Sequence, residues 1–200
     1  MAFDVYDDYE QGERVQQWLR KNGVSIAVGI VLGLVLIFGW QQWKSHRANH
    51  EQAAATEYSA LQVAVAQNRA NEIDMRTETL LKDYSDTAWS VFAAGERAQR
   101  NVLAGQLDKA AGDLEWARAH AKDDSLKTLV ELRAAQLKYA QGKPQEAIAA
   151  LDAIKGASFV ALAQELRGDA LVKLGRPDDA RKAYQAAIAA MGDSAPQRGV

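Results

Sequence analysis

Three short stretches decide how this chain folds: Gly105-Gln-Leu-Asp-Lys-Ala110, Gly142-Lys-Pro-Gln-Glu-Ala147 and Gly175-Arg-Pro-Asp-Asp-Ala180. Their glycines are 37 and 33 residues apart. Seven positions before each glycine comes a small residue, which gives the small-residue column Ala98, Ala135 and Gly168. Nine positions after each glycine comes a large residue, which gives the column Leu114, Leu151 and Tyr184. Glycine can end a helix in the left-handed conformation, and a small residue lets two helices pack closely. The pattern therefore predicts three successive helical hairpins.

A period of about 34 residues with these columns is the pattern of the tetratricopeptide repeat. Low proline content and abundant alanine also favour helices throughout. We therefore predict an all-α chain in which residues 85–191 form a tetratricopeptide-like α-solenoid. Residues 44–84 are predicted to be a helical linker and N-terminal cap, with helices over 51–69 and 71–84, because stacked repeats need atypical ends. Residues 192–200 are predicted to be a flexible tail.

A different pattern occupies residues 22–43, which carry no charge and include the apolar run VSIAVGIVLGLVLIFGW from Val24 to Trp40. A helix of this length spans about 33 Å, enough for the roughly 30 Å hydrocarbon core of a bilayer. A cleaved signal peptide would begin with basic residues, whereas the first 13 residues are acidic and contain no base. A buried core helix of this length and uniformity is also disfavoured, because a helix of a soluble protein would show a polar face. We therefore predict one transmembrane helix over 22–43, in contact with lipid, after a short N-terminal segment, 1–21.

The orientation of this helix is left open by the charges around it. Arg14, Arg20 and Lys21 precede the segment, and Lys44 and Arg47 follow it. Three basic residues against two favour an N-terminus inside the cell only slightly, and large domains can cross a membrane whatever their charge.

Small residues recur every four positions along the apolar segment, at Ser25, Gly29 and Gly33. Such a stripe lets a second membrane helix approach closely, so these residues are candidates for a membrane-helix contact. Glycine is also common in membrane helices without such a role, and this alternative stays open.

Composition and motifs argue against enzymes and nucleic-acid binders. The net charge is −2, and the chain has no basic cluster that would bind nucleic acid and no cysteine for disulfide, thiolate or redox chemistry. Phosphate loops, dinucleotide-binding glycine motifs and serine elbows are absent from the sequence. His46 and His50 lie one helical turn apart but have no suitable third metal ligand. We therefore predict a non-enzymatic protein with no catalytic, cofactor-binding or metal residues.

The repeat predicts a binding surface instead, a concave groove lined by the first helix of each hairpin. Counting from the small-residue column, the inward face carries Phe92, Gln99, Val102, Leu129, Leu132, Gln136, Tyr139, Leu162, Asp169 and Val172. These mostly apolar side chains suit an extended or hydrophobic protein segment better than an acidic tail. For any one of them, packing against a neighbouring helix is an equally good explanation.

The order of anchor and repeats resembles the YfgM family, ancillary subunits of the bacterial SecYEG translocon. The resemblance rests on the residues of the membrane segment, such as Ala27-Val28-Gly29, Leu32-Gly33 and Gly39-Trp40, and on the late stretch with Leu151-Asp152 and Leu166-Arg167-Gly168. It runs from about residue 10 to about residue 190, although residues 60–125 match only as a helical pattern.

This resemblance implies a bacterial inner-membrane protein with a short cytoplasmic N-terminus and a periplasmic repeat domain. The partners it implies are SecYEG, a membrane-tethered periplasmic chaperone of the peptidyl-prolyl isomerase type, and newly exported client proteins. It supplies no catalytic residues. A general tetratricopeptide scaffold in envelope assembly or cell division remains the alternative.

Overall fold

The computed structural model describes residues 4–154 and 159–191, with side chains from residue 12 onward. The tail predicted at 192–200 lies outside the described residues. The elements found within them are all α-helices, as the composition predicts: α1 (Asp4–Ala66), α2 (Ala70–Asp83), α3 (Ala88–Leu103), α4 (Leu107–His120), α5 (Asp124–Ala140), α6 (Pro144–Ala153), α7 (Val160–Lys173) and α8 (Pro177–Met191). The chain separates into two units, 1–50 and 51–200.

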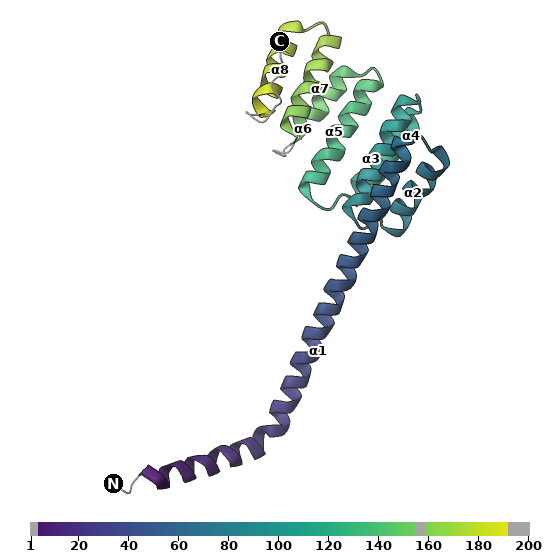
Figure 1. Cartoon of the computed structure of the whole chain (residues 1–200). Helices are drawn as coiled ribbons and strands as arrows, with labels where there is room; N and C mark the ends of the chain where they lie inside the picture. Colours follow the sequence, from purple (N-terminus) through teal and green to yellow (C-terminus); the bar gives the residue numbers. More distant parts are fainter. Residues whose placement is uncertain (1–3, 155–158, 192–200) are drawn as a thin grey trace. The chain divides into compact units, whose positions relative to one another are not determined.

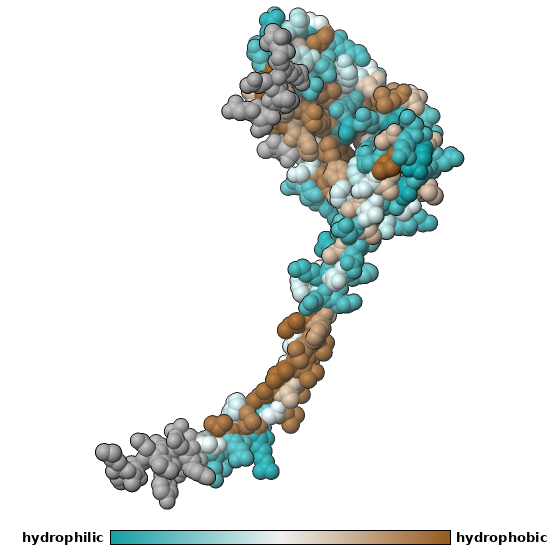
Figure 2. All heavy atoms as spheres, in the orientation of Figure 1, coloured by the Kyte–Doolittle hydropathy of each residue, from teal (hydrophilic) through white to brown (hydrophobic). Residues whose placement is uncertain are grey.

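The first unit consists of the greater part of α1, which contains a segment long and apolar enough to cross a membrane. Every large apolar side chain from Val24 to Trp43 is exposed, and Figure 2 shows the resulting hydrophobic band on this helix. The rings of Trp40 and Trp43 lie 5.2 Å apart at the end of the band, where an amphipathic indole suits a membrane–water interface. Such a band agrees with the predicted membrane helix over 22–43.

The second unit is a stack of helical hairpins (Figure 1). Helices α3 and α4, α5 and α6, and α7 and α8 form three antiparallel pairs, and α3, α5 and α7 also contact one another in turn. This neighbour-to-neighbour packing is typical of a solenoid. It confirms the tetratricopeptide-like fold and the three hairpins.

Identical turns close the first helices of the hairpins. Gly105, Gly142 and Gly175 all have positive φ, between 70° and 76°. Each donates its N–H to the carbonyl three residues back, and the next residue donates to the carbonyl five residues back, at 2.8–3.0 Å. This is the Schellman motif, which satisfies carbonyls left free at a helix C-terminus. The glycines therefore have the role that their spacing predicts.

Asn68 makes the same turn at the end of α1, with φ of 53° and the same two hydrogen bonds. Asparagine tolerates the left-handed conformation better than other residues that carry a side chain. The last turns of α1 and the whole of α2, predicted as an N-terminal cap, thus repeat the hairpin geometry. Counting from Asn68 as from Gly105, Ile73, Thr77 and Leu80 correspond to the buried Ala110, Leu114 and Ala117. All three are themselves buried.

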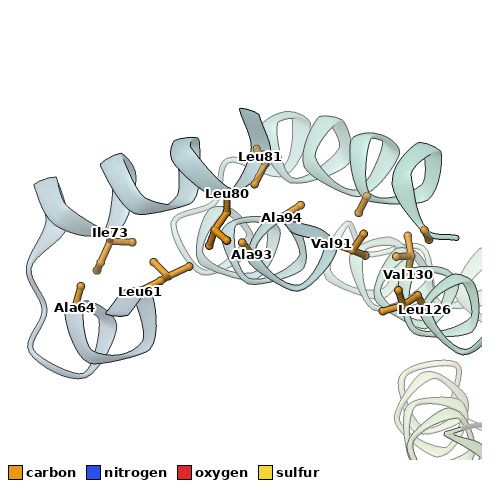
Figure 3. Close-up of a cluster of buried hydrophobic side chains, with 12 residues drawn as sticks. Leu61, Ala64, Ile73, Leu80, Leu81, Val91, Ala93, Ala94, Leu126 and Val130 are labelled. Atoms are coloured by element: carbon orange, nitrogen blue, oxygen red, sulfur yellow. The ribbon is translucent and has the colours of Figure 1, made fainter. Parts of the chain in front are cut away.

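The core of the stack begins between α1, α2 and α3, where large side chains fill the space between hairpins. Figure 3 shows Leu61 of α1 and Leu80 of α2 directed toward each other beside Ala93 and Ala94 of α3. The small residues Ala98 and Ala135 are buried at 2% and 0% exposure, as their column predicts. Ala98 clusters with Ala110 and Leu114 of α4, so a small residue at this position lets the two helices of a hairpin pack closely.

Candidate protein-binding groove

The first helices of the hairpins carry the predicted groove residues, and the structure brings five of the ten together between α3 and α5. Phe92 and Leu129 line a hollow of about 100 Å³. Gln99, Val102 and Gln136 line a second hollow of about 240 Å³. Both hollows share Gly95, Leu114 and Arg133, so they adjoin. We call the two hollows together the α3–α5 groove.

Leu132 does not line this groove, which corrects the prediction made for it. Its side chain is 2% exposed and packs in a core cluster with Ala135, Leu151 and Leu166. The reason is its place in the central hairpin, where α6 and α7 cover the face of α5 that an end hairpin leaves open. Packing against neighbouring helices is therefore the correct explanation for this leucine.

Tyr139 takes part in packing between hairpins, and Asp169 in a contact within the third hairpin. Tyr139 packs against two core clusters, and Nζ of Lys173 lies 4.8 Å from the centre of its ring. Asp169 accepts a hydrogen bond of 2.7 Å from the Tyr184 hydroxyl. That hydrogen bond, together with burial, raises the pKa of Tyr184 to about 12, because the carboxylate opposes formation of a phenolate.

Leu162 and Val172, the remaining two, are exposed on α7 at 47% and 55%. Neither lines the hollows found between α3 and α5. They extend the accessible apolar surface to the third hairpin and stay candidates for contact with a partner.

Aromatic side chains line the smaller hollow of the α3–α5 groove: Tyr58 and Phe92 line it, and Trp89 packs against both. The ring of Tyr58, from α1, lies 5.3 Å from that of Trp89 and 6.1 Å from that of Phe92. Trp89 and Phe92 meet edge to face, with 6.0 Å between their centres. Half-buried aromatic rings of this kind offer a large apolar contact with little loss of side-chain freedom on binding.

Two charged residues, Glu96 and Arg133, line the groove between the apolar groups. Glu96 accepts hydrogen bonds from the Tyr58 hydroxyl at 2.5 Å and from Nε2 of Gln62 at 2.6 Å. Burial, followed by the contact with Glu96, raises the pKa of Tyr58 well above its ordinary value. Nη1 of Arg133 donates to Oε1 of Gln99 at 3.0 Å and to Oε1 of Gln136 at 3.3 Å.

Sequence reasoning missed Tyr58, Gly95, Glu96 and Arg133 as groove residues. Tyr58 was missed because the turn that follows it contains Asn68 and not the glycine that marks the other repeats. Glu96 and Arg133 each lie two positions before a small-column alanine, Ala98 or Ala135, so they occupy equivalent places on neighbouring helices. That equivalence was visible in the sequence and would have identified them.

Two further hollows lie outside the face on which the groove was predicted. One of about 450 Å³ lies among α4, α5 and α6, with Leu114, Ala134 and Leu137 in its floor and charged residues such as Arg118 around it. Another of about 340 Å³ lies among α6, α7 and α8. Among the side chains described, no group of three histidine or acidic residues is placed to bind a metal ion.

The membrane stripe is placed on α1 as predicted. A methyl group added at Gly29 or Gly33 would meet nothing within 4 Å, so this side of the helix is open in the described chain. The contact proposed for Ser25, Gly29 and Gly33 stays a prediction.

Comparison with known proteins agrees with the observed fold and identifies relatives of this chain. A family model described as a tetratricopeptide repeat-like domain matches residues 16–200. The ancillary SecYEG translocon subunit of Escherichia coli (strain K12) is 31% identical over 92% of this chain and 89% of the relative. The ancillary SecYEG translocon subunit of Haemophilus influenzae is 28% identical over 94% of this chain and 91% of its own. The ancillary SecYEG translocon subunit of Neisseria gonorrhoeae is 25% identical over 92% of this chain and 89% of the relative.

Proposed function

Since the chain belongs to the family of ancillary SecYEG translocon subunits, we propose that it associates with SecYEG in the bacterial inner membrane and holds polypeptides in its α3–α5 groove. This family is non-enzymatic and works through protein–protein contacts. The observation that carries the proposal is the groove itself, an open apolar hollow with aromatic rings at one end and a few polar groups within it. Such a surface fits a protein segment and lacks the arrangement of groups that a reaction requires.

The partners we propose for the groove are a membrane-tethered periplasmic chaperone of the peptidyl-prolyl isomerase type and exported clients that have just left the channel. Both present extended, partly apolar segments. A membrane anchor supports this role, because it holds the repeat domain near the site where clients emerge and so raises the local concentration of both.

A groove that faces clients must lie in the periplasm, so we expect residues 44–200 on that side and residues 1–21 in the cytoplasm. The chain has no cysteine, which allows single-cysteine variants to report the orientation directly. A cysteine in place of the exposed Ala149 is expected to react with a membrane-impermeant maleimide once the outer membrane is permeabilised. A cysteine in place of Gln16 should react only after the inner membrane is broken. The reverse order of labelling would contradict this topology.

Gly95 offers a way to block the groove without disturbing the fold. It lines both hollows, and a Cβ added there meets nothing within 4 Å. Gly95→Trp is therefore expected to fill the groove and to reduce co-purification of the chaperone and clients at least ten-fold from membranes in mild detergent. The melting temperature should not fall, because glycine inside a helix is less favourable than other residues.

The matched control is Gly112→Trp on α4, an exposed position outside the groove where an added Cβ also meets nothing within 4 Å. It should retain all partners. Full retention by Gly95→Trp would remove the groove from the proposal, and recovery of cell-division proteins in place of SecYEG would favour the general scaffold. SecYEG recovered with Gly95→Trp but without the chaperone would assign the translocon contact to another surface, such as the stripe on α1.

A further inference from the structure

Arg133 is the one cationic side chain among the residues that line the α3–α5 groove, and its hydrogen bonds go to neutral groups. Its guanidinium is half-buried and donates to the amide oxygens of Gln99 and Gln136. Within residues 12–154 and 159–191, Arg133 has no carboxylate partner. By contrast, Arg97 pairs with Asp113 at 2.7 Å, and Arg76 pairs with Glu72 and Glu57 at 2.8 and 3.0 Å.

Internal carboxylates do not fill this role. Glu96 lines the same groove, but its Oε1 already accepts from Tyr58 and Gln62. Gln99 and Gln136 hold one edge of the guanidinium from two neighbouring helices and thereby fix its position. A guanidinium has five N–H donors, so donors remain for a further acceptor.

Arginine in a partly buried place is best matched by a carboxylate, which it can bind through two parallel hydrogen bonds. The surroundings of Arg133 define where that carboxylate sits. Phe92 and Leu129 line the hollow on one side of it, and Val102 and Leu103 line the hollow on the other side. A ligand that fills both hollows continues past Arg133 in both directions.

We infer that the α3–α5 groove selects polypeptide segments in which an aspartate or glutamate side chain stands between large apolar side chains, with Arg133 binding the carboxylate. This inference rests on the proposed function of the groove and adds the chemistry of what it holds. Continuation of the groove on both sides assigns the carboxylate to a side chain inside the segment, since a C-terminal carboxylate would leave one hollow unfilled.

The test uses the full chain in detergent micelles and two labelled peptides that differ at one position, glutamate or glutamine, between two leucines. Fluorescence anisotropy should show the glutamate peptide binding about ten-fold more tightly, the ratio expected for a hydrogen bond to a charged group. Arg133→Gln should remove this preference while keeping the affinity for the glutamine peptide. Arg133→Glu should reverse it, so that a peptide with lysine at the same position becomes the tightest ligand.

Arg118→Gln provides a matched control, because Arg118 is exposed and lines the hollow among α4, α5 and α6 but neither hollow of the α3–α5 groove. It should leave the glutamate preference unchanged. Equal affinity of the parent chain for both peptides, with binding lost in Gly95→Trp, would overturn the role of Arg133 and leave the groove in place. If neither peptide binds, both the role of Arg133 and the proposed function of the groove are overturned. If a peptide that ends in a free carboxylate binds more tightly than the peptide with an internal glutamate, the carboxylate that Arg133 binds is a chain terminus and not a side chain.

Discussion

Leu132→Ala is expected to lower the free energy of unfolding by about 2–5 kcal/mol, the range measured for leucines removed from well-packed cores. Leu132 is 2% exposed and contacts Leu151 of α6 and Leu166 of α7, so its removal leaves a cavity where two hairpins meet. Adjacent helices cannot close this cavity without losing their own contacts. Urea unfolding of the full chain in micelles, followed by circular dichroism, measures the change.

The matched variant is Leu162→Ala, the same substitution on α7 at a side chain that is 47% exposed. It should change the free energy of unfolding by no more than about 0.5 kcal/mol. Both leucines were predicted to line the groove, so the pair separates a core position from a surface one. Similar losses of stability for the two would contradict the packing described for α5.

Gly168→Ala is expected to destabilise the third hairpin by about 1–3 kcal/mol through overpacking. A Cβ at this position would lie 2.4–2.7 Å from three ring atoms of Tyr184, which real structures do not tolerate. The ring cannot simply rotate away, because its hydroxyl is bonded to Asp169 at 2.7 Å. Thermal unfolding of the full chain should show a lower midpoint.

Two further variants test whether the tyrosine ring is the cause of this destabilisation. Gly112→Ala, in α4 with open space around the new methyl group, should stabilise the chain by up to about 1 kcal/mol through helix propensity. In a Tyr184→Ala background, Gly168→Ala should likewise become neutral or stabilising. Continued destabilisation in that background would mean that something other than the tyrosine ring opposes the methyl group.

The hairpins could be predicted from the sequence because each depends on local rules. Gly105, Gly142 and Gly175 mark turns that only a few residues can make, and Ala98 and Ala135 mark close approaches between helices. These requirements act within about 40 residues and recur in each hairpin. Comparing the three hairpin sequences with one another was therefore enough to predict the fold of the repeat.

The groove could be predicted only in part, because helical periodicity gives the direction of a side chain but not what covers it. Leu132 and Leu129 are separated by one turn of α5, yet one enters the core and the other lines the groove. Which of them is covered depends on α6 and α7, and their placement is a property of the assembled stack. The sequence could have placed Arg133 on the groove face, but not its hydrogen bond to Gln99, which lies 34 residues away in sequence.

Because each hairpin packs only on its neighbours, we expect the repeat domain to bend more easily than a globular domain with a single core. Each hairpin contacts only its neighbours in the stack, through α3 with α5, α4 with α5, α5 with α7 and α6 with α7, so small rotations at successive junctions would add up to a change in the width of the inner surface. Low-energy bending modes of this kind let one binding surface adjust to side chains of different size. If the groove holds many different exported sequences, as proposed, such compliance serves it better than a single rigid fit.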